Sequence, residues 1–243
     1  MQTTRMKSLA TTGTMLMVLF PMLAHSDQAP ILAEVNLYSQ SMAQLEGGEG
    51  NKTLSEVYAN GRVVAEKLAR VLESLSNDDY AISEKGMKGF FVFREETVGV
   101  LPDMKFFKEL VGRRGTRGDV EFFSLMIDVY HDGTWPAFIQ QQTDYSGCTV
   151  FGDGTLTKLY IEATKLKKTA SATYQKQLGE LIEEIQSNLT EVVCACGNAD
   201  SVIKELTLFS ESAPNADFIA EIKSRITEVK ARKSKDRFVC HSG

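Results

Sequence analysis

The chain has 243 residues, enough for one sizeable hydrophobic core, and its formal net charge is −5. An acidic chain has no general electrostatic attraction for nucleic acid or for an anionic membrane surface, so we expect no nucleic-acid partner. Any site for an anion must therefore be local.

Residues 1–26 have the features of a secretory signal peptide. Two basic residues open the segment, an apolar run covers residues 9–23, and the small residues Ala24 and Ser26 stand at the −3 and −1 positions of a cleavage point. The alternative, a membrane anchor, is disfavoured because the most apolar part, residues 15–23, is too short to span a bilayer. We predict removal of the segment, a periplasmic or secreted location, and no stable membrane insertion afterwards.

Residues 27–243 are predicted to form a single all-α domain, a bundle or array of about seven helices. A first amphipathic helix ends in the Gly-rich break at 47–50. The segment "TLSE" at 53–56 is a capping box, in which the side chains of Thr53 and Glu56 each accept a hydrogen bond from the backbone of the other. It opens a helix whose apolar stripe runs to Leu75.

Residues 80–101 are less regular, and "KGFFVFREETVGVL" predicts a short β-hairpin near 88–101, with a broken helix as the alternative. Pro102 suits the first position of the next helix. The segment "GRRGTRGD" at 112–119 interrupts the helical pattern, and a further helix begins with Asp119 as its N-cap.

Residues 134–154 form the longest irregular stretch between predicted helices. Long loops inside compact domains are often functional. The rest of the chain shows helical periodicity, and we predict four further helices, near 155–168, 172–196, 200–210 and 215–232.

Four cysteines follow the signal peptide, and an even number of cysteines in an oxidising compartment favours disulfides over a metal clip or a thiol-exchange site. They are Cys148, Cys194, Cys196 and Cys240. The two central cysteines lie at the end of the predicted helix 172–196, where positions two apart point about 200° from each other. We therefore expect two disulfides in which Cys194 and Cys196 are not paired to each other. Two connectivities with Cys148 and Cys240 remain open.

Asn51 and Asn188 each begin a glycosylation sequon, which matters only if the host is eukaryotic.

Two features indicate recognition rather than catalysis. The first is a cluster of arginines at a Gly-rich turn, Arg113, Arg114 and Arg117, whose guanidinium groups could hold a carboxylate or phosphate. The simpler interpretation is that basic residues favour the negative end of a helix dipole. The second feature is the group of aromatic residues in and beside the 134–154 loop, which could bind a ligand or plug the end of the bundle. They are Trp135, Phe138, Tyr145 and Phe151.

We therefore favour an exported binding or interaction protein. Its contact surface would be the loop 134–154, with Trp135 and Tyr145, together with the arginine cluster 113–117. The partner would be an unknown protein or an anionic envelope component.

The alternative is an exported hydrolase, metal-assisted or using two carboxylates. Its centre would be Asp128 and His131, one helical turn apart, with Asp132 beside them. An ordinary polar helix end accounts for the same residues. No "GxSxG", "HExxH", phosphate-loop or dinucleotide motif is present, which disfavours the common serine, zinc and nucleotide chemistries. We predict no resident metal and no cofactor.

Overall fold

The computed structural model describes residues 28–95, 97–131, 135–143, 146–191, 193–234 and 236–238. In these ranges the chain is mostly helical, with nine α-helices. They are α1 (Gln28–Gly47), α2 (Leu54–Val71), α3 (Asn77–Gly86), α4 (Met104–Arg114), α5 (Arg117–Tyr130), α6 (Thr155–Lys167), α7 (Ala172–Thr190), α8 (Ala199–Ser212) and α9 (Ile219–Lys230), and a short 3-10 turn, η1 (Leu72–Ser74), follows α2. None of the helices in these ranges is long and apolar enough to cross a membrane.

Two small sheets correct the all-α prediction. The first is the antiparallel hairpin of β1 (Phe90–Arg94) and β2 (Val98–Pro102), which confirms the predicted hairpin. The second has three strands in the order β3-β4-β5, and much of it lies in the stretch expected to be irregular. Its strands are β3 (Ile139–Thr143), β4 (Ser146–Val150) and β5 (Ala195–Cys196), and β4 runs antiparallel to β3 and parallel to β5.

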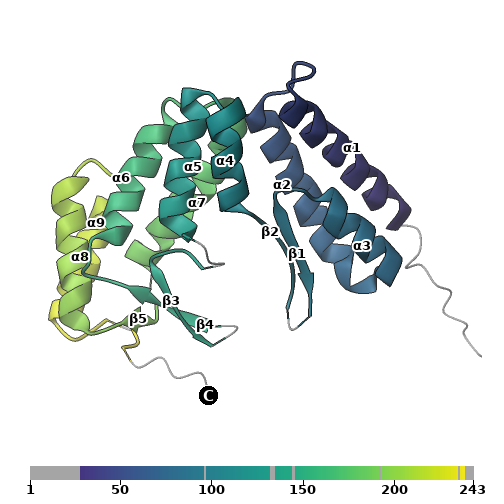
Figure 1. The fold of residues 1–243 in the computed structure, drawn as a ribbon. Helices are drawn as coiled ribbons and strands as arrows, with labels where there is room; N and C mark the ends of the chain where they lie inside the picture. Colours follow the sequence, from purple (N-terminus) through teal and green to yellow (C-terminus); the bar gives the residue numbers. More distant parts are fainter. Residues whose placement is uncertain are drawn as a thin grey trace, which may run out of the picture.

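The helices form an arch (Figure 1). Helices α1, α2 and α3 make one end, α4 to α7 the middle, and α8 and α9 the other end, while both sheets lie on the inner side of the arch. The buried apolar side chains nevertheless form one cluster, from Ile31 in α1 to Val229 in α9. At its centre the ring of Tyr58 meets Phe107 and Phe123 edge to face, with centroids 4.9 and 5.0 Å apart.

The helix starts test three local predictions. The capping box at Thr53 and Glu56 is confirmed, with both reciprocal hydrogen bonds present. Pro102 ends β2 instead of starting a helix, and α4 is capped by the side chain of Asp103, which accepts hydrogen bonds from two amides of the first turn. For α5 the N-cap is Thr116, and Asp119, the third residue of the helix, completes a second capping box.

The predicted helix 172–196 is too long, because α7 ends at Thr190. The next residues, "EVVC", favour extended backbone, and the last of them, Cys194, lies at the edge of β4. There the amide of Thr149 donates to the carbonyl of Cys194 (2.7 Å). Cys196 is therefore in a strand, where it forms a disulfide with Cys148. The helical premise used for the cysteines was wrong, but this bond belongs to one of the two connectivities left open.

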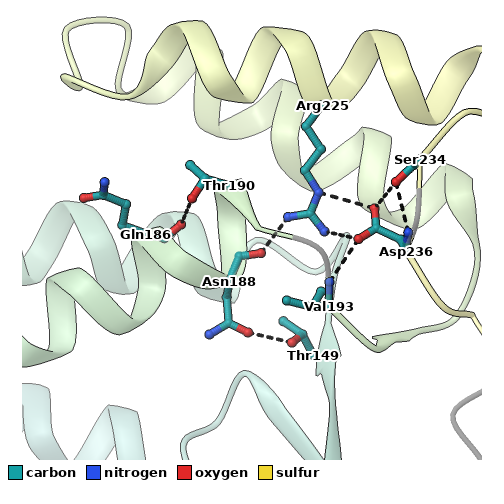
Figure 2. A network of polar contacts seen from close by, with 8 residues as sticks. All are labelled: Thr149, Gln186, Asn188, Thr190, Val193, Arg225, Ser234 and Asp236. Carbon is teal, nitrogen blue, oxygen red and sulfur yellow. Dashed lines mark hydrogen bonds and ion pairs between the residues drawn. The ribbon is translucent and has the colours of Figure 1, made fainter.

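A buried ion pair fastens the segment around Asp236 to α7 and α9 (Figure 2). The guanidinium of Arg225 donates to both carboxylate oxygens of Asp236, at 2.8 and 3.3 Å, and to the backbone carbonyl of Asn188 at 2.7 Å. Asp236 also accepts from the amide of Val193 and the hydroxyl of Ser234. Both charged side chains are almost completely buried, so the partners replace water as their hydrogen-bonding environment.

Helix α6 has an N-terminal cap that comes from another helix. Its own N-cap residue, Gly154, has no side chain to accept a hydrogen bond. The buried carboxylate of Glu205, from α8, instead accepts from the amides of Gly152, Gly154 and Thr157 and from the hydroxyl of Thr157. A carboxylate at a helix N-terminus is favoured by the dipole, so this contact fixes the position of α6.

Candidate functional site

The predicted arginine cluster does not form one binding fork. Arg114 donates to the backbone carbonyl of Glu46 (2.8 Å) and so satisfies the C-terminal end of α1. Arg117 points into solvent with 92% of its side chain exposed and pairs with Glu121 on the same helix (2.9 Å). Arg113 is exposed in the last turn of α4. Arg114 and Arg117 thus have intramolecular partners of the kind that helix ends favour.

The predicted loop 134–154 contains the β3–β4 hairpin, held by the disulfide to Cys196. Phe138 and Phe151 are buried, as the plug interpretation expects. Trp135 is partly exposed and its ring lies beside Gly147 of β4. Tyr145 lies outside the described residues. Of the two predicted contact residues in this segment, Trp135 is the one that the structure describes, and it lies partly exposed to solvent.

The two halves of the predicted contact surface are not brought together. Arg117 begins α5, and Trp135 follows the other end of the same helix. Fourteen residues of α-helix span about 20 Å. A single compact ligand would not reach both, so a surface made of both halves requires an extended partner.

The alternative hydrolase centre gains no supporting contact. Asp128 pairs with Lys158 of α6 (2.8 Å), and the hydrogen bond to Asp128 holds the pKa of Lys158 above its usual value. His131 is the exposed C-cap of α5, with a positive φ of 48°. Asp132 lies outside the described residues. Among the residues that the structure describes, no group of three or more His, Cys, Asp or Glu side chains could hold a metal ion.

A groove of about 720 Å³ between α5 and α6 is the candidate functional site. The two helices lie side by side (Figure 1), and the pairing of Asp128 with Lys158 shows that they run antiparallel, because the end of α5 meets the start of α6. The groove is lined from α5 by Arg117, Val120, Glu121, Ser124, Leu125 and Asp128, and from α6 and the residues after it by Glu162, Lys165, Leu166 and Thr169.

The lining residues follow helical spacing on both sides of the groove. On each helix they recur at intervals of three and four residues, so each helix presents one continuous face. Leu125 and Leu166 form an apolar floor, and Val120 stays 47% exposed above it. A volume in the range of ordinary ligand sites with a largely apolar floor is suited to binding.

The charges at the rim differ between the two ends of the groove. Arg117 and Lys165 lie at one end with the single carboxylate of Glu121. Asp128 and Glu162 lie at the other end, where Lys158 pairs with Asp128. The first end therefore has an excess of positive charge and the second an excess of negative charge.

Sequence reasoning identified two of these residues, Arg117 and Asp128, but for different sites. The signal that could have revealed the groove is Val120, an apolar residue of α5 that does not lie among the buried residues of that helix. Sequence alone did not show that α6 lies opposite, because the cap that positions α6 comes from Glu205, about fifty residues further along the chain.

The chain was compared with models of known protein families, with curated proteins and with solved structures, and none of the three gives a match.

Proposed function

We propose that the chain is an exported binding protein that holds a partner segment in the groove between α5 and α6. The observation that carries the proposal is the apolar floor of that groove, above which Val120 is exposed. Charged residues lie at both ends of the groove. Exposed apolar surface with a polar rim is typical of interaction sites.

An amphipathic helix is the partner segment that fits this shape best. A groove between two packed helices accepts the ridge of a third, with apolar anchors at helical spacing. From Arg117 to Asp128 the lining of α5 spans twelve residues, or about 16 Å, which matches about three turns of a bound helix. The charges at the two ends favour a partner with acidic residues facing Arg117 and Lys165, and basic residues facing Asp128 and Glu162.

Site-specific photo-crosslinking in the producing organism tests this function. With p-benzoylphenylalanine in place of Ser124, on the groove, we expect one discrete adduct that mass spectrometry can identify. The same amino acid in place of Ile82, an exposed apolar residue of α3, is the control position. Equal adducts from both positions would contradict the groove as the binding site.

A matched pair of valine substitutions sharpens the test. Val120→Asp places a charge over the apolar floor, so the adduct from Ser124 should disappear. Val63→Asp makes the same change at a valine of α2 that is 45% exposed, and the adduct should remain. Loss of the adduct in both variants would point to a general effect on the protein.

We also propose that residues 1–26 direct export and that a second disulfide joins Cys194 to Cys240. The Cys148–Cys196 bond supports this, because it leaves those two cysteines as partners in the predicted set of four. Peptide mapping without reduction, on protein from its native location, should find both cross-linked peptides and an N-terminus at Asp27. A free thiol at Cys240 would contradict the second bond.

A further inference from the structure

A second, smaller cavity of about 150 Å³ lies where four helices meet. It is on a different face of α5 from the groove, and it shares no lining residue with it. Its lining comes from α2, α4, α5 and α7, through Tyr58, Arg62, Met104, Met126, Tyr130, Gln177, Glu180, Leu181 and Glu184.

The cavity is lined by both apolar and polar side chains. Tyr58, Leu181 and the two methionines are buried, whereas Glu180 and Glu184 are exposed on their solvent side. Burial raises the pKa of Tyr58 to about 12, so its phenol is neutral at physiological pH. The inner wall thus suits the hydrocarbon part of a ligand, and the mouth suits a charged group.

The charges around the mouth leave one carboxylate without a counter-ion. Arg62 and Lys176 face Glu66 and Glu180 at distances between 3.5 and 4.0 Å, so two cations balance two carboxylates. Glu184 takes part in no ion pair or side-chain hydrogen bond among the described residues, although surrounding atoms displace enough water to raise its pKa. The uncompensated charge is therefore negative.

Gln177, which lines the same cavity, has an unsatisfied hydrogen-bond acceptor. The side-chain oxygen of Gln177 is buried and has no donor among the described residues. Gln177 and Glu184 are seven positions apart, two turns along one face of α7, with the cavity between them. A buried acceptor without a partner costs free energy, which a ligand that supplies an N–H or O–H would recover.

From these observations we propose that the cavity binds a small primary ammonium compound that carries a second hydrogen-bond donor. The ammonium group donates to Glu184 at the mouth, and a short hydrocarbon spacer contacts Met104, Met126 and Leu181. The second donor bonds to the side-chain oxygen of Gln177, whose amide turns toward the ligand. Because one water molecule takes up about 30 Å³ of liquid, the cavity holds a ligand of about five non-hydrogen atoms.

Calorimetric titration of the intact oxidised protein with three molecules of equal length tests the proposal. The probes are 3-aminopropan-1-ol, which has both groups, butylamine, which lacks the hydroxyl, and propane-1,3-diol, which lacks the charge. We expect the amino alcohol to bind most tightly, butylamine more weakly, and the diol without measurable affinity. Equal binding of the amino alcohol and the diol, or no binding of the amino alcohol, would overturn the proposal.

Two substitutions assign the contacts. Glu184→Gln should weaken binding of the amino alcohol at least about tenfold, because charge-assisted hydrogen bonds are roughly twice as strong as neutral ones. Glu183→Gln removes the same charge from an exposed neighbour outside the cavity and should leave binding unchanged. Gln177→Leu should abolish the preference for the amino alcohol over butylamine. Unchanged binding in Glu184→Gln, or equal losses in Glu184→Gln and Glu183→Gln, would refute the assigned contact.

Discussion

At the scale of single residues, the best-defined polar group is the buried pair of Arg225 and Asp236 (Figure 2). Three segments meet on it, because the same two side chains also bond to the backbone of Asn188 and Val193. A buried pair is weak evidence for stability in itself, since desolvation offsets the attraction. The pair matters because it gives the backbone carbonyl of Asn188 and the backbone amide of Val193 their hydrogen-bond partners.

Removing the cation should be much more costly than removing an exposed one. Arg225→Met leaves the carboxylate of Asp236 buried and uncompensated, so the free energy of unfolding should fall by about 3–5 kcal/mol. Lys67→Met breaks the exposed pair with Glu34 and should cost less than about 1 kcal/mol. Urea unfolding followed by circular dichroism measures both, and equal costs would contradict the argument.

The carboxyl of Glu184 should make stability depend on pH. Its pKa is raised in the folded chain, so the folded state binds the proton more tightly, and stability falls as pH rises from the unfolded pKa through the folded one. Glu184→Gln should therefore exceed the wild type in melting temperature at pH 7, with the difference vanishing near pH 4. The titratable and charged groups that line the same cavity as Glu184 are Tyr58 and Arg62 of α2, Tyr130 of α5 and Glu180 of its own helix. A difference that does not vary with pH would argue against this origin.

At the scale of elements, the helices with a clear apolar stripe and a cap could be predicted from the sequence, as at Thr53. The hairpin β1–β2 could be predicted as well, because both strands and their turn are local. The pairing of β4 with β5 could not, since the parallel pairing of Thr149 with Ala195 joins segments far apart in sequence. The groove was missed for the same reason, because its second wall depends on a distant cap.

Two helical glycines show how packing overrides helix propensity. A Cβ added at Gly61 of α2 would lie 2.6 Å from the ring of Tyr38 and 2.7 Å from Phe90, whereas at Gly112 of α4 nothing lies within 4 Å. Gly112→Ala should therefore stabilise by about 0.5–1 kcal/mol through propensity alone. Gly61→Ala should destabilise by about 1–3 kcal/mol, because the rings must move. Thermal unfolding of the two variants measures whether the melting temperature rises in Gly112→Ala and falls in Gly61→Ala. A change in the same direction in both would show that one of the two arguments fails.

At the scale of the whole molecule, the disulfide between Cys148 and Cys196 joins the middle of the chain to the segment after α7. The double variant Cys148→Ala/Cys196→Ala should lose about 4 kcal/mol of unfolding free energy, from a sequence separation of 48 residues in the chain-entropy model. Guanidinium unfolding of oxidised protein measures the loss. Reducing the wild type should lower its free energy of unfolding as well. If only the double variant loses stability, the cause is changed packing and not the missing cross-link.

The hydrogen bonds between Arg237 and the segment after α7 have a consequence for synthesis. The amide of Ala195 donates to the carbonyl of Arg237, and the amide of Arg237 donates to the carbonyl of Val193. The chain must therefore be synthesised beyond Arg237 before this ladder can close, whereas the contacts of α1, α2 and α3 with one another and with the first hairpin join segments that are made much earlier. Premature termination at Ser234 would leave Arg225 charged and buried with no carboxylate to meet it, so quality-control proteases should recognise such a product at this end first.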